Sequence, residues 1–158
     1  MSNPVTIEAV PGTSYADLAR EFDAPVEALF RAHADPELYA RWIGPRRLVN
    51  TITHWDFRTG GGWGYESRDT DGSVFAFRGV YHLIVPNELV IQTFEFLGAP
   101  GEVSLERMRF EALPGGRSRL SGRSVMTSRE ALEQMIESGM EYGVREGYEK
   151  LDELLAGE

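Results

Sequence analysis

Hydrophobic and polar residues follow two different periods along this chain, and the changes of period divide it into helices and strands. Apolar residues recur at helical spacing over residues 26–33, and Pro25 suits the first turn of that helix. From residue 48 the period becomes two, and short segments rich in glycine, proline and aspartate interrupt it. The pattern predicts a strand, two short helices, six antiparallel strands and a long helix, at 15–22, 25–33, 35–43, 48–57, 63–68, 74–85, 89–96, 103–111, 117–126 and 128–156.

Two of the predicted strands differ in how clearly their pattern shows which face points toward the core. In the strand at 74–85, apolar residues occupy both faces, so its orientation stays open. In the strand at 48–57, period two puts five residues on one face, namely Val49, Thr51, Thr53, Trp55 and Phe57.

The last predicted helix carries glycines on its apolar side. Thr127 and Glu130 have the spacing of a capping box and predict where the helix begins. Gly139, Gly143 and Gly147 recur every fourth residue and therefore line one face. Each should weaken the helix by about 1 kcal/mol relative to alanine. The stripe indicates either empty space for a ligand beneath the helix or close packing against another backbone.

The dimensions of these elements predict the fold class. A helix over 128–156 would be roughly 43 Å long, and seven strands would span roughly 29 Å. One helix can therefore cross the whole sheet. We predict an α+β fold in which a curved antiparallel sheet of about seven strands wraps around the C-terminal helix. The cleft between helix and sheet is where a small molecule would bind.

Length and composition fit one domain. The chain has 158 residues, 42% of them hydrophobic, and the predicted domain spans 15–158. Residues 1–14, which contain Pro4, Pro11 and Gly12, are predicted to be a flexible tail. The chain has no cysteine, which excludes disulfides and thiolate catalysis and agrees with a cytoplasmic location.

Charge narrows the choice of partners. The net charge of −9 argues against nucleic acid and anionic membranes as partners. No apolar run approaches the roughly 20 residues of a membrane span. The three histidines lack metal-ligand spacing, so neither a metal nor a cofactor is predicted. The acidic residues of the last helix, namely Glu133, Glu137, Glu141, Glu149 and Asp152, are predicted to form a solvated face.

Six short motifs occur in order: Phe22-Asp23-Ala24-Pro25, Asp35-Pro36-Glu37, Trp42 with Gly44-Pro45, and the segments 56–61, 79–81 and 139–155. Together they resemble the START-like, or SRPBCC, superfamily, and within it the bacterial proteins related to the C-terminal domain of the activator of heat-shock protein 90 ATPase. The resemblance covers about residues 15–155. It implies a helix-grip fold with an internal pocket for apolar ligands. It supplies no catalytic motif, so the catalytic residues stay unassigned.

The residues predicted to line such a pocket are aromatic, methionine, histidine and glycine residues from the predicted helices and strands. Plain core packing is the alternative interpretation for the large side chains, and a hydrogen-bonded core histidine is the alternative for the histidine. The predicted pocket residues are Phe30, His33, Trp42, Trp55, Phe77, Tyr81, Phe94, Met108, Met135, Gly139 and Gly143.

A second group of polar residues lies near the glycine-rich turn at 60–62. His54 and Asp56 are two apart on one strand face, which would suit either an acid–base pair or a solvated pair. Asp56 and Arg58 would either recognise a polar ligand group or hold the turn in place.

Three functions remain open from the sequence. The first is a protein that binds a small apolar or aromatic molecule without catalysis. The second is a cyclase-like or aromatase-like enzyme that orients its substrate in the same cavity. The third is an interaction module that activates a chaperone ATPase. An unpaired sheet edge or an apolar surface would also allow a homodimer.

Overall fold

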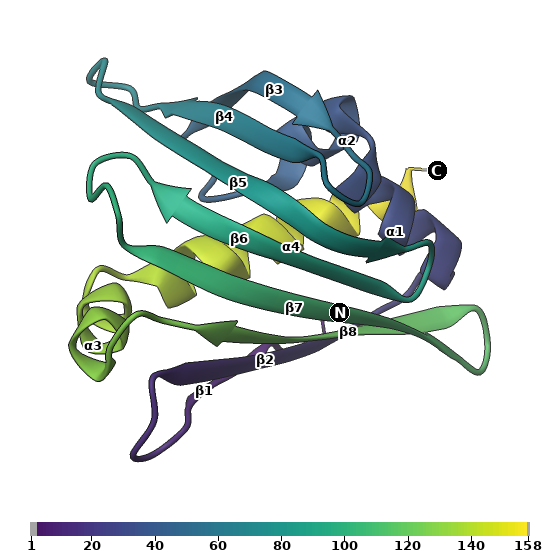
Figure 1. Ribbon diagram of the computed structural model, residues 1–158. Coiled ribbons are helices and arrows are strands. Elements are labelled where there is room, and N and C mark those ends of the chain that lie inside the picture. Colours follow the sequence, from purple (N-terminus) through teal and green to yellow (C-terminus); the bar gives the residue numbers. More distant parts are fainter. Residues whose placement is uncertain (1–2, 158) are drawn as a thin grey trace.

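The computed structural model describes residues 3–157 and contains one eight-stranded antiparallel sheet and four helices in that range. The spatial order of the strands is β1-β2-β8-β7-β6-β5-β4-β3. Helices α1, α2 and α4 lie together on one side of the sheet (Figure 1). The elements are β1 Thr6–Ala9, β2 Tyr15–Phe22, α1 Val26–Ala34, α2 Pro36–Trp42, β3 Val49–Asp56, β4 Gly62–Arg68, β5 Val74–Val85, β6 Leu89–Phe96, β7 Val103–Leu113, β8 Arg117–Val125, α3 Arg129–Glu137 and α4 Met140–Ala156.

The predicted fold class is confirmed: an antiparallel sheet is combined with a C-terminal helix in an α+β fold. The start of α2 is also confirmed. The Asp35 carboxylate accepts a hydrogen bond from the Glu37 backbone N–H at 2.9 Å, and Pro36 occupies the first turn.

Part of the predicted tail is a strand. Residues 6–9 form β1, which pairs with β2 from Thr6 opposite Ala19 to Ala9 opposite Ala16. The sheet therefore has one strand more than the sequence predicted. Without β1, the outer edge of β2 would present unpaired backbone groups, and pairing satisfies them. Residues 1–2 of the predicted tail and residue 158 of the predicted domain lie outside the described residues.

The prediction of a single C-terminal helix beginning at a Thr127 capping box is wrong. The cap is Ser128, whose hydroxyl accepts a hydrogen bond from the Ala131 N–H at 3.0 Å, while the Thr127 hydroxyl bonds to the Glu102 carboxylate. The helix then breaks, and α4 begins after Gly139, whose φ of 86° lies in the left-handed region. Glycine adopts that conformation without a steric cost, so Gly139 is a joint between α3 and α4.

The predicted face of β3 is also wrong at its beginning. Pairing with β4 shifts register between Ile52 and His54, which is a β-bulge. One extra residue exchanges the two faces, so Val49 and Thr51 are exposed, while Trp55 turns toward the helices. Periodicity within a single strand cannot reveal such an insertion.

The core lies between the helices and the inner face of the sheet, the face that they cover. Phe22, Leu29, Leu120 and Leu151 are all at most 1% exposed and come from β2, α1, β8 and α4. The helices and the sheet both contribute large apolar side chains to this core. Burial of each such side chain stabilises the fold by roughly 2 kcal/mol.

Two glycines of α4 lie close to the end of α2. A Cβ atom at Gly147 would lie 3.1 Å from the Trp42 carbonyl oxygen, and one at Gly143 would lie 3.4 Å from Pro45 Cδ. The helix therefore approaches the backbone at the end of α2. Close packing thus accounts for glycine at position 147, whereas position 143 makes an ordinary contact with Pro45.

Candidate functional site

A row of polar side chains crosses the inner face of the sheet. Tyr81 on β5 lies opposite Gln92 on β6, Gln92 lies opposite Glu106 on β7, and Glu106 lies opposite Ser124 on β8. Glu106 and Phe110 are four residues apart on an unbroken strand, so Glu106 faces the same interior as the buried Phe110. We call Tyr81, Gln92, Glu106 and Ser124 the polar row.

Hydrogen bonds within the polar row converge on Glu106. Gln92 Nε2 donates to Glu106 Oε1 at 2.9 Å, and Ser124 Oγ donates to Glu106 Oε2 at 3.4 Å. Burial raises the pKa of the Glu106 carboxyl, and these two hydrogen bonds oppose that rise only in part. A carboxyl group held this way can accept further hydrogen bonds or bind a proton.

Aromatic side chains from three elements surround the polar row. Tyr39 comes from α2, Tyr65 from β4 and Tyr148 from α4, and each is at most 8% exposed. Burial raises the pKa of the Tyr39 hydroxyl, and the nearby Tyr65, Tyr81, Glu106 and Tyr148 raise it further. Helix and sheet residues that are distant in sequence thus meet around one carboxyl group.

The inner face has two parts that differ in packing. Phe22, Phe110, Leu120 and Leu151 are at most 3% exposed, and we call them the closed half. The other part remains partly exposed although its side chains point toward the helices. We call this part the open half, and it comprises Phe77, Phe94, Glu106, Met108 and Ser124.

Helix α4 shows the same difference along its length. Val144, near its beginning, is partly exposed, whereas Tyr148 and Leu151 are buried. On α3, Leu132 is 1% exposed but does not belong to the main core cluster. The beginning of α4 is therefore packed less tightly than its later turns.

Trp63 contributes an unpaired donor beside the polar row. Its Nε1 is the one buried side-chain nitrogen or oxygen within residues 3–157 that has no hydrogen-bond partner. The indole packs against Tyr65 and Phe94, with ring centroids 5.7 and 5.4 Å away. It also lies over Gly79, where a Cβ would come within 2.4 Å of Nε1. An unpaired buried donor costs roughly 1–3 kcal/mol, so a ligand acceptor would be stabilised here.

Three of the predicted pocket residues belong to the closed part of the interior. His33 Nδ1 donates to the Leu29 carbonyl at 2.9 Å, and Trp42 Nε1 donates to the Ala32 carbonyl at 2.9 Å. Phe30 packs on Phe110 with 5.0 Å between ring centroids. Burial lowers the pKa of His33 to about 4, so its imidazole is neutral at pH 7. These contacts are those of core residues.

Five other predicted pocket residues lie on the inner face of the sheet. Phe77, Phe94 and Met108 belong to the open half, and Tyr81 begins the polar row. Trp55 is also turned inward, and its Nε1 donates to the Ala34 carbonyl at 2.8 Å.

The remaining predicted residues belong to α3, α4 and their joint. Met135 on α3 is partly exposed, and Gly139 is exposed and lies outside both helices. Gly143 on α4 packs toward Pro45. The structure therefore does not bring all the predicted residues into one cavity.

Gln92, Glu106 and Ser124 were missed by reasoning from the sequence. The alternation in 103–111 could have shown that Glu106 shares a face with Phe110. It could not have shown that Gln92 and Ser124 are its neighbours, because cross-strand register depends on the turns and on the whole sheet.

The polar residues near the 60–62 turn have another role. Arg58 Nε donates to both carboxylate oxygens of Asp56 at 3.0 Å, which holds the turn. His54 lies on the outer face, opposite the helices, where it borders a shallow groove of about 640 Å³ with Gly64 and Val80. A second hollow of about 490 Å³ lies at the end of α4. Neither of these two hollows lies between α4 and the inner face.

Over residues 3–157, no group of three or more His, Asp and Glu side chains is arranged to hold a metal ion. No helix in the same range is long and apolar enough to span a lipid bilayer.

The sheet, the covering helices and the polar interior define an α+β helix-grip protein of the START-like superfamily. The family described as "Activator of Hsp90 ATPase homolog 1-like protein" matches residues 23–156, and the chain belongs to this family.

Solved structures agree with this assignment. A protein from Arthrobacter aurescens is 26% identical with a TM-score of 0.88, over 97% of this chain and 92% of that chain. A protein from Mycobacterium smegmatis is 25% identical with a TM-score of 0.86, over 96% of this chain and 97% of that chain. A Rhodobacter sphaeroides protein, 22% identical with a TM-score of 0.89 over 98% and 100% of the two chains, supports the fold alone. A comparison with curated proteins finds no match.

Proposed function

We propose that the protein binds a small apolar or aromatic molecule between α4 and the inner face of the sheet, with a polar group of the ligand at the polar row. The observation that carries this proposal is Glu106, a partly exposed residue whose carboxyl group faces the interior and interacts electrostatically with three buried tyrosines. An apolar surface with a few converging polar groups is the usual composition of a ligand site.

We expect the α3–α4 corner to move when a ligand binds. α3 inserts Leu132 as its only buried side chain among residues 129–137, and Gly139 joins it to α4 with a φ of 86°. A short, lightly packed helix on a glycine joint can shift without disturbing the closed half. Such a shift would enlarge the space beside the open half.

Amide chemical shifts on the labelled protein test this location. Titration with 1-naphthalenemethanol, a neutral aromatic alcohol, should shift the amides of Phe94, Ser124 and Tyr148. It should leave Glu66 and Val80, which border the outer groove, unchanged. Phe94→Ala should weaken binding by about tenfold, whereas Val80→Ala should not. Shifts confined to the outer groove, or no shifts at all, would overturn the proposal.

The cyclase-like enzyme has one observation in its favour. The raised pKa of Glu106 suits a group that exchanges a proton with a substrate in the interior. The test is mass spectrometry of a linear aromatic polyketone incubated with the protein and with the Glu106→Gln variant. Cyclised product formed by the wild type and lost in the variant would favour the enzyme. Equal amounts with both proteins would remove it.

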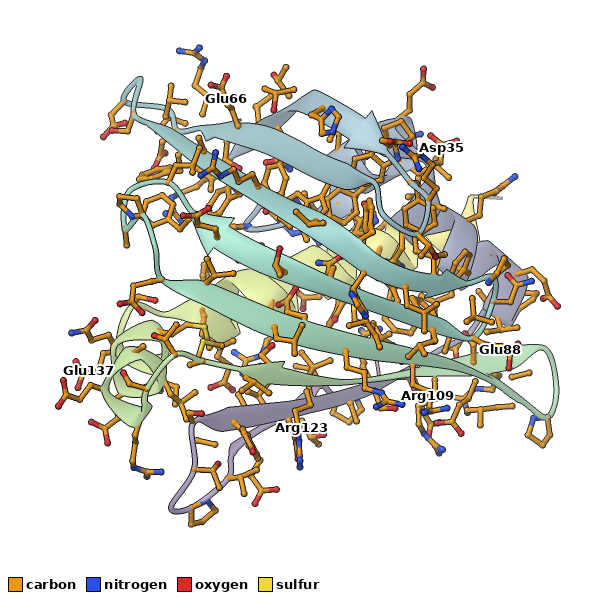
Figure 2. The ribbon with its side chains drawn as sticks, in the orientation of Figure 1. Asp35, Glu66, Glu88, Arg109, Arg123 and Glu137 are labelled. Carbon is orange, nitrogen blue, oxygen red and sulfur yellow. The ribbon has the colours of Figure 1, made fainter. Side chains whose placement is uncertain are left out.

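The chaperone-activating module rests on the family description and on apolar residues of the outer face. Val80 and Leu105 are 55% and 47% exposed there. Arg109 and Arg123 lie on neighbouring strands of the same face (Figure 2). Such a surface could bind a partner chain or a second copy of this chain. Stimulated ATP turnover by the organism's own Hsp90, reduced by Val80→Ser with Leu105→Ser, would support it, and unchanged turnover would remove it.

A further inference from the structure

The Glu106 carboxyl has unused hydrogen-bonding capacity. Its two partners, Gln92 and Ser124, are neutral side chains and engage one oxygen each. A carboxylate has about four acceptor positions. The negative charge at the centre of the polar row is therefore hydrogen-bonded but not neutralised by these contacts.

The cation buried in the same interior is already engaged. Arg20 has a side chain that is 2% exposed, and its Nη1 and Nη2 donate to the two carboxylate oxygens of Asp152 at 2.8 and 2.6 Å. The guanidinium also lies 4.7 Å from the centre of the Phe22 ring and 5.8 Å from that of Tyr148. This interior thus already holds one cation between a carboxylate and aromatic rings.

Around Glu106 a carboxyl group again lies near aromatic side chains, and the hydrogen bonds that it accepts within residues 3–157 come from neutral groups. Tyr39, Tyr65 and Tyr148 are close enough for the charge of Glu106 to raise the pKa of each hydroxyl. Aromatic rings present negative potential at their faces, which attracts cations and disfavours anions. Burial raises the pKa of Glu106, as expected for a carboxyl whose charge is not compensated.

We infer that the ligand is an organic cation: a primary or secondary ammonium group on an aromatic or alicyclic body. This inference rests on the proposed function. The ammonium donates to the free acceptor positions of Glu106 and to tyrosine hydroxyl oxygens, while the body lies on Phe77 and Phe94. A ligand carboxylate is rejected, because it would meet both Glu106 and the ring faces. A neutral alcohol binds more weakly, because it leaves the charge of Glu106 uncompensated.

Three probes that share one ring system test the inference. They are 1-naphthylmethylamine, 1-naphthalenemethanol and 1-naphthoic acid, which are cationic, neutral and anionic at pH 7.5. Titration calorimetry on the full chain should show the amine binding about tenfold to a hundredfold more tightly than the alcohol, with no binding of the acid. Glu106→Gln should abolish this preference and leave the affinity for the alcohol within about threefold.

Glu111→Gln is the matched control. Glu111 lies on the same strand, is exposed and points away from the helices, so the same chemical change should keep the preference for the amine. Equal affinity for amine and alcohol, or a preference that survives in Glu106→Gln, would overturn the cation inference while interior binding stands. Failure of all three probes to bind would overturn the proposed function itself. The preference is measured on the wild type, so the inference stays testable even if Glu106→Gln does not fold.

Discussion

The closed and open halves share strands β7 and β8, yet they are packed differently. On β7, Phe110 is 3% exposed and contacts Phe30 and His33, whereas Glu106, four residues away, is partly exposed beside neutral polar partners. Phe30 and His33 of α1 cover the first position, whereas the second lies near Tyr148 of α4. Stability is therefore concentrated at one end of the sheet, and the other end can adapt to a ligand.

The largest expected difference comes from truncating one ring in each half. Phe110→Ala should lower the free energy of unfolding by about 4 kcal/mol, because it leaves a cavity among buried rings. Phe94→Ala should cost about 2 kcal/mol, because its site is already partly exposed. Urea unfolding at pH 7.5 measures both values. Equal losses would mean that the two halves are equally packed.

The next largest expected effect is the pH dependence of the free energy of unfolding that the buried His33 causes. Burial lowers the pKa of His33 from 6.5 to about 4. Between pH 6.5 and about pH 4, His33 is protonated in the unfolded chain but neutral in the folded protein. The stability of the fold therefore decreases as pH falls through this range. The expected loss is about 3 kcal/mol on acidification from pH 7 to pH 4.

Unfolding measured across this range with His33→Gln checks the effect, since the variant should lack that slope. The raised pKa of Glu106 acts in the opposite direction, so its contribution decreases as pH rises. Glu106→Gln therefore steepens the loss on acidification. A wild-type slope that survives in His33→Gln would assign it to other groups.

A smaller effect is expected where the last helix meets the sheet. Asp152 was predicted to lie on the solvated face, and that prediction is wrong, because its carboxylate pairs with the buried Arg20. Asp152→Ala leaves the guanidinium unpaired and should cost about 2 kcal/mol, less than for a fully buried pair, because Asp152 is 28% exposed. Glu141→Ala, on an exposed pair with Arg145, should cost about 0.5 kcal/mol or less. Similar thermal denaturation of both variants would contradict this account.

The smallest expected changes in stability are those of alanine substitutions at the two glycines of α4. Gly147→Ala should destabilise by about 1 kcal/mol, because backbone atoms 3.1 and 3.3 Å from the new Cβ cannot yield easily. Gly143→Ala should be neutral or stabilise by up to about 1 kcal/mol, because Pro45 is at contact distance and alanine favours the helix. Melting temperatures rank the two variants. A higher melting temperature for Gly147→Ala than for Gly143→Ala would instead support empty space beneath the glycine stripe.

Much of the fold was predictable because its determinants are local. Period-two segments and glycine- or proline-containing turns identified the strands, and Asp35 with Pro36 identified the start of α2. The bulge between Ile52 and His54 was not predictable, because a single strand does not reveal an extra residue relative to its neighbour.

The candidate site was predicted only in its aromatic part. Phe77, Tyr81 and Phe94 could be chosen because large aromatic side chains favour the interior, although the orientation of the strand at 74–85 stayed open. Glu106 was not chosen, because a lone glutamate in a strand is most simply placed in solvent, and its partners come from two other strands.

The sequence by itself determined the order of helices and strands, the turns between them and the apolar character of the inner face. These depend on periodicity and turn chemistry over a few neighbouring residues. Only the tertiary structure decided that β1 joins the sheet, that Gly139 divides the last helix and that Gln92, Glu106 and Ser124 form one row. Those outcomes depend on cross-strand register and on which helix covers which strand, and both are set by packing of the whole chain.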